Sequence, residues 1–95
     1  MSALKENAIS IYVHLLNRYI ANGDRGFKFS YGELKAVVGM GTKSHGNNYI
    51  IASILFVLEK LGLLRLKEKK IFDEGLVSTE HEIVWMTNKL DLNGC

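Results

Sequence analysis

The segment from Thr42 to Leu64, TKSHGNNYIIASILFVLEKLGLL, constrains the fold more than any other part of the chain. Its first third is small, polar and basic. Its later part carries apolar residues at intervals of three and four, namely Ile50, Ile51, Ile54, Leu55, Val57, Leu58 and Leu61. These intervals match an α-helix that is buried along one side and ends at Gly62, which can take the left-handed conformation. We therefore expect a helix whose apolar side belongs to the core and whose polar amino end remains free.

The residues before this segment predict two further helices and a short strand. Residues 3–22 form a helix with a wide apolar face, made of Ala8, Ile9, Tyr12, Val13, Leu16, Tyr19 and Ile20 and widened by Ile11 and Leu15. Such a wide face predicts burial on two sides, against the domain and against a second subunit. Phe27–Phe29 alternates apolar and polar residues as a strand does. Ser30 to Glu33 matches a capping box that opens a helix over 31–38, which the turn Gly39-Met40-Gly41 ends.

The residues after Gly62 predict two strands separated by a loop. Residues 63–67 begin the first strand, and a hydrated stretch follows to Lys70. Ile71 and Phe72 either continue this strand or pack back on the core. Residues 73–81 have little pattern and are expected to form a loop. Residues 82–87 are rich in strand-forming side chains, and Trp85 and Met86 should point to opposite faces of that strand.

This order of elements resembles the winged helix-turn-helix superfamily from about Ala8 to Thr87. The resemblance depends on the capped start at Ser30–Glu33, the turn Gly39–Gly41 and the string Leu58–Leu64, LEKLGLL. That string is similar to the junction between helix and wing in MarR-, PadR- and ArsR-like regulators, and small plasmid centromere-binding adaptors have a similar size and layout. The resemblance implies an α+β fold with three helices and a small antiparallel β-sheet, the wing. It implies one domain over residues 1–95, with a core over about 4–88 and a tail over 89–95.

In a helix-turn-helix the second helix of the pair enters the major groove of DNA, with its amino-terminal residues toward the bases. Asparagine can pair with adenine and lysine with guanine, while hydroxyl groups suit phosphate. The candidate DNA-binding residues here are Thr42, Lys43, Ser44, His45, Asn47, Asn48 and Tyr49. The alternative is a polar, well-capped helix start that only faces solvent. We favour DNA contact because a second basic segment follows.

That second segment would be the wing, with Arg65, Lys67, Lys69 and Lys70 as its candidate DNA contacts. Wings commonly follow the phosphate backbone or the minor groove. The alternative is a solvated lysine face that serves solubility, which is the usual role of a run of charges.

Other classes of function find little support in the sequence. The three histidines, His14, His45 and His81, share no metal-ligand spacing, and no grouping suggests a catalytic triad or a carboxylate pair. The segment Gly39–Ser44 differs from a nucleotide-binding loop because Thr42 separates the glycine from the lysine and a helix precedes it. We therefore expect no enzyme activity and no cofactor. With one cysteine, Cys95, we expect no metal site. Without a long apolar run, we expect no membrane contact and a cytoplasmic location.

We therefore expect a sequence-specific protein that binds double-stranded DNA as a homodimer paired through the first helix. It would serve as a transcriptional regulator or a plasmid partition adaptor. The alternative is a winged-helix module that binds a protein partner and no DNA. The sequence indicates neither the DNA target nor an effector ligand.

Overall fold

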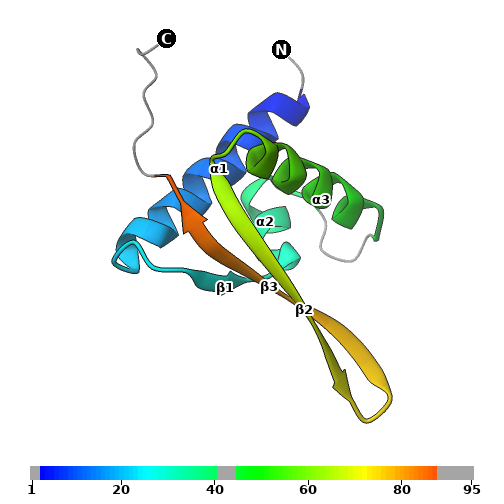
Figure 1. Ribbon diagram of the computed structural model, residues 1–95. Helices are drawn as coiled ribbons and strands as arrows, with labels where there is room; N and C mark the ends of the chain where they lie inside the picture. The colour runs from blue at the N-terminus through cyan, green and yellow to red at the C-terminus, as the bar shows by residue number, and fades with distance from the viewer. Residues whose placement is uncertain (1–2, 41–44, 88–95) are drawn as a thin grey trace, which may run out of the picture.

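The computed structural model of the protein describes residues 3–40 and 45–87, and in these residues the chain forms three helices and three strands. In chain order the elements are α1 (Ala3–Ala21), β1 (Phe27–Phe29), α2 (Tyr31–Val37), α3 (His45–Lys60), β2 (Leu64–Asp73) and β3 (Leu76–Met86). The strands form one antiparallel sheet in the order β1-β3-β2. The helices gather at one end of this sheet, and the far half of the β2–β3 hairpin extends away from them (Figure 1). The predicted α+β class with a small antiparallel sheet is confirmed.

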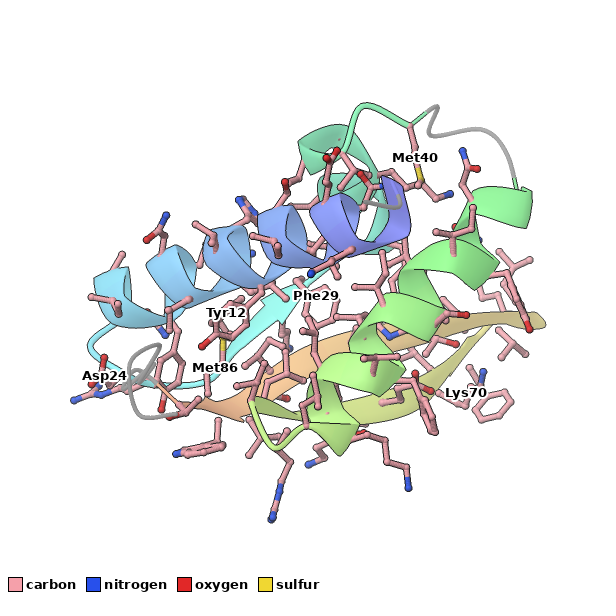
Figure 2. All side chains as sticks on the ribbon, turned by 90° about the horizontal axis from the view of Figure 1, so that it is seen from above. Tyr12, Asp24, Phe29, Met40, Lys70 and Met86 are labelled. Atoms are coloured by element: carbon pink, nitrogen blue, oxygen red, sulfur yellow. The ribbon has the colours of Figure 1, made fainter. Side chains whose placement is uncertain are left out.

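The core lies between the helices and the near half of the sheet, where Tyr12, Phe29 and Met86 lie together (Figure 2). Its most deeply buried side chains come from every helix and from β3: Ile11, Leu15, Leu34, Ile51, Ile54, Leu55, Ile83 and Met86. Each of these side chains contributes about 1.5–3 kcal/mol through its burial. Trp85, the neighbour of Met86, is 47% exposed, so the two point to opposite faces as predicted.

The predicted apolar faces of α1 and α3 are turned to the core only in part. In α1 the face turned to the core is centred on Ile11 and Leu15, which are fully buried, whereas Ile9, Val13 and Ile20 are about half exposed. In α3 the predicted inward residues Val57 and Leu61 are exposed. Both helices carry apolar residues around more than half of their circumference. Periodicity alone therefore could not select the side that packs against the sheet.

The predicted loop over residues 73–81 was wrong: Asp73 ends β2 and residues 76–81 belong to β3, so only Glu74 and Gly75 form a turn. β2 and β3 pair from Leu64 opposite Met86 out to Asp73 opposite Leu76. The reversal is made by Glu74 and Gly75, both with positive φ (48° and 82°), a conformation that glycine adopts without strain. The outer half of this hairpin carries little hydrophobic alternation because both of its faces are exposed.

Half of the predicted capping box is present at the start of α2. The Ser30 hydroxyl accepts a hydrogen bond from the Glu33 amide at 3.1 Å. The Glu33 carboxylate contacts α1 instead, where it accepts hydrogen bonds from Arg18 and lies 2.6 Å from His14 Nε2. Glu33 therefore links α2 to α1, and His14 has a structural role beside this carboxylate.

Candidate functional site

A groove lies between the start of α2, the first turns of α3 and the β2–β3 hairpin. Its volume is about 540 Å³, and its lining is mainly polar. The residues that line it are Phe29, Ser30, Tyr31, Asn48, Glu68, Lys70, Thr79 and His81. The groove therefore joins the start of the predicted recognition helix to one face of the predicted wing.

The register of the hairpin decides which side chains share that face. Side chains alternate between the two faces of a strand, and residues directly opposite in an antiparallel pair share one face. Glu68 is opposite His81 and Lys70 is opposite Thr79, which places these four on the groove side. The residues that alternate with them in β2, Lys67 and Lys69, lie on the outer face of the sheet.

The outer face carries a nearly balanced set of charges. Lys67 lies opposite Glu82 and Lys69 opposite Glu80, and Lys28 of β1 joins them. The Lys28 Nζ atom is 2.6 Å from the Glu80 carboxylate. Their hydrogen bond raises the pKa of Lys28 and lowers that of Glu80. Two of the four predicted wing cations, Lys67 and Lys69, thus face carboxylates.

Lys70 differs from these lysines because it lies on the groove side. It is exposed and lies out on the hairpin (Figure 2), and its Nζ donates a hydrogen bond to the Thr79 hydroxyl at 2.8 Å. Its hydrogen-bond partner is therefore a neutral hydroxyl and not a carboxylate, although the Glu68 carboxylate lines the same groove. Of the four predicted wing cations, Lys70 is the one that shares a surface with α3.

His81 forms the base of the groove among aromatic rings. Its ring stacks on Tyr31 with 4.3 Å between centroids and lies 5.7 Å from the Phe29 ring. Its Nδ1 is 3.7 Å from a carboxylate oxygen of Glu68. Burial lowers the pKa of His81, and Lys70 acts in the same direction, while Glu68 opposes both. Burial and the charge of Glu68 raise the pKa of Tyr31.

The predicted contacts on α3 are only partly brought together. Thr42, Lys43 and Ser44 lie outside the described residues, and His45 is the first residue of α3. Asn48 lines the groove, Asn47 is half-buried, and Tyr49 is 77% exposed.

The predicted wing residues divide between the two faces. Arg65 lies opposite Trp85 on the outer face, together with Lys67 and Lys69.

Sequence reasoning missed the residues that complete the groove, Tyr31, Glu68, Thr79 and His81. The signal that could have found them is Asp73-Glu74-Gly75, which is typical of a tight reversal between strands. A hairpin centred there places His81 opposite Glu68 and Thr79 opposite Lys70.

The free side of α3 is apolar rather than charged. Phe56, Val57 and Leu61 are exposed by 59%, 49% and 67%, and Lys60 lies over the Phe56 ring at 5.5 Å. This surface is separate from the groove, and a helix that contacted DNA along its whole length would present polar groups there. Asn48, the described side chain of α3 that lines the groove, lies in the first turns of the helix.

The described residues contain no group of three histidine, cysteine, aspartate or glutamate side chains placed to hold a metal ion. None of the described helices has the length and apolar character required to cross a membrane. Comparison of the chain with protein families, with curated protein sequences and with solved structures found no match.

Proposed function

We propose that the protein is a winged helix-turn-helix domain that binds double-stranded DNA with the start of α3 and the groove side of the hairpin. The element order and the strand order β1-β3-β2 support this assignment, because winged-helix domains have the same topology. The observation that carries the proposal is that Asn48 of α3 and Lys70 of the hairpin line one groove. A helix in the major groove and a wing beside it require these two elements to face the same side.

In this proposal the two elements have different roles. The first turn of α3, with His45, Asn47, Asn48 and Tyr49, enters the major groove, where amide side chains can distinguish base pairs. Lys70 contacts the backbone, which adds affinity for any sequence. Lys67, Lys69 and Arg65 lie on the other face of the hairpin and contribute only through their long-range charge.

The proposed active form is a homodimer. Ile9, Val13, Leu16 and Ile20 form a stripe along α1 with spacings of four, three and four residues, which is the pattern of a helix pair. Three of the four are about half exposed and Leu16 is half-buried. Two copies paired through this stripe would present two α3 helices to a palindromic or repeated site, as a cytoplasmic transcriptional regulator or a plasmid partition adaptor does.

The direct test is a titration of the full chain against random duplex DNA at low salt, followed by a selection of bound sequences. We expect binding that weakens steeply as salt is raised, because phosphate contacts release counterions. Asn47→Ala should reduce the discrimination between selected and random duplexes. Failure to bind any duplex at low salt would contradict the proposal.

A second candidate function is a protein-interaction module, and the apolar outer side of α3 favours it. Phe56, Val57 and Leu61 resemble the anchors that a helix presents to a groove in a partner. A pull-down that recovers a protein partner through wild-type chain but not through Phe56→Ser, with no DNA binding by either, would support this candidate. Loss of DNA binding in Phe56→Ser, with the fold intact, would instead assign the same side to DNA recognition.

A further inference from the structure

The groove concentrates groups that can donate hydrogen bonds to an anion. The Lys70 ammonium, the Asn48 amide and the hydroxyls of Ser30 and Thr79 reach it from four different elements or their flanks. Its volume of about 540 Å³ exceeds that of a phosphate group and leaves room for the attached sugars. One carboxylate, that of Glu68, also lines it and would repel an anion.

We propose that this groove holds one phosphate group of the DNA backbone, that Lys70 is its principal contact, and that Glu68 and His81 set how tightly it is held. The inference rests on the DNA-binding function proposed above. It deepens that function by assigning the phosphate to one face of the hairpin and by coupling its binding to protonation.

The charged groups around His81 show how this coupling arises. Glu68 and Lys70 face it from β2, and Tyr31 stacks on it from α2. Asn48 of α3, Thr79 of β3 and Phe29 of β1 contribute no charge, and the carboxylates of Glu80 and Glu82 lie on the outer face. With His81 neutral, Lys70 and Glu68 cancel to zero; with His81 protonated, the same three groups sum to +1.

A phosphate in the groove therefore favours the protonated form of His81. By linkage, protonation of His81 strengthens phosphate binding by the same factor. The imidazolium also pairs with Glu68, whose carboxylate lies 3.7 Å from Nδ1, and so weakens the repulsion that Glu68 exerts on the phosphate. DNA binding should consequently tighten as the pH falls.

The first experiment compares adjacent lysines on opposite faces of β2. The dissociation constant of a short duplex is measured by fluorescence anisotropy for wild type, Lys70→Ala, Lys69→Ala and Glu68→Gln. We expect Lys70→Ala to weaken binding about fivefold and Glu68→Gln to tighten it by a similar factor. Lys70→Ala should also reduce the slope of log affinity against log salt by about 0.9 for each subunit bound to the duplex. Lys69→Ala, the matched control, should change binding less than about twofold.

The second experiment tests the role of His81. His81→Phe keeps an aromatic ring against Tyr31 and removes the titratable group. Wild type should bind the duplex about fivefold more tightly near pH 5.5 than near pH 8, and His81→Phe should lose most of this difference. Circular dichroism at both pH values shows whether the variant is folded. If His81→Phe does not fold, the Glu68→Gln measurement still decides the proposal.

A third measurement separates this inference from the proposed function. Inorganic phosphate at millimolar concentration is titrated into the isotope-labelled full chain, with sodium chloride at equal ionic strength as the control. We expect amide shifts at Asn48, Lys70 and Thr79 and none at Lys69. If wild type binds no DNA but these shifts occur, the DNA-binding function fails and the anion site remains. If wild type binds DNA while Lys70→Ala matches Lys69→Ala, the groove assignment is overturned and the DNA-binding function remains.

Discussion

Arg18 of α1 and Glu33 of α2 form the main polar link between their helices, because Arg18 Nη1 lies 2.8 Å from both carboxylate oxygens of Glu33. Arg18 also lies over the Phe27 ring at 4.4 Å, and His14 lies beside the same carboxylate. About a third of each side chain in the Arg18–Glu33 pair remains exposed. Solvent therefore screens this pair only in part.

Glu33→Gln should lower the free energy of unfolding by about 1 kcal/mol, because the amide cannot replace the charge-assisted hydrogen bonds to Arg18. Urea unfolding measures the change. Glu80→Gln is the matched control: it breaks the pair with Lys28 on the open outer face and should cost less. Equal losses in the two variants would show that the contact between α1 and α2 gains nothing from its partial burial.

Gly26 lies where β1 begins, against the bulged part of β3. A β-carbon at this position would overlap the Ile83 carbonyl oxygen and lie 3.2 Å from that of Val84. Both neighbours are backbone atoms that cannot move aside without breaking the pairing of β1 with β3. Gly26→Ala should therefore destabilise the protein by about 2–3 kcal/mol, measured by urea unfolding.

The control for this substitution is Gly32→Ala inside α2. Its new β-carbon would lie 3.8 Å from Ser30 Oγ, at ordinary contact distance. Alanine is the better helix former, so this variant should gain about 0.5–1 kcal/mol. A Gly26→Ala variant as stable as Gly32→Ala would show that β1 does not lie as closely on β3 as described.

The exposed stripe on α1 predicts the oligomeric state. Val13→Glu places a charge in the middle of the stripe, where Val13 is 47% exposed, so the monomer should fold while the pairing of helices is lost. Sedimentation velocity should find wild type as a dimer and Val13→Glu as a monomer. Ser10→Glu, on an exposed part of α1 outside the stripe, should remain a dimer. A monomeric wild type at tens of micromolar would rule out this interface.

The lowered pKa of His81 predicts that the free energy of unfolding falls as the pH falls. Burial lowers its pKa in the folded state below the ordinary value of about 6.5, so the unfolded chain binds more protons in the window just below that value. The stability contributed by neutral His81 is therefore present above about pH 6.5 and is lost as the pH falls through the folded-state pKa.

Thermal melting is measured in a buffer without phosphate as the pH falls below about 6.5. His81→Phe should lose less stability over this range than wild type. Identical losses in both proteins would assign the acid sensitivity to other groups. Because DNA should raise the pKa of His81, bound duplex should also protect wild type most strongly at the acid end.

The sequence predicted the elements that pack on the core and missed those that do not. The helical spacing of Ile51, Ile54, Leu55 and Leu58 gave α3 correctly, because these residues are buried along one side. Residues 76–80 fall inside the loop predicted over residues 73–81, because this part of β3 leaves the core and burial imposes no alternation on it.

The candidate site was likewise predictable only where local sequence signals mark its residues. The local signals at Ser30 and Asn48 were visible in the sequence. The pairing of Lys70 with Thr79 and of Glu68 with His81 depends on the register of the hairpin, which can be derived only once the reversal is placed at Glu74 and Gly75. The same register determines which lysines share a face.

The central position of β3 in the sheet affects the order in which the protein folds. Within the described sheet, β1 is paired only with β3, and Phe27 lies opposite Ile83, a separation of 56 residues along the chain. During synthesis β1 therefore has no partner until almost all described residues have left the ribosome, while the local β2–β3 reversal can close at once. We expect the hairpin to form early and the docking of β1 to limit the folding rate, since contacts between distant residues form slowly.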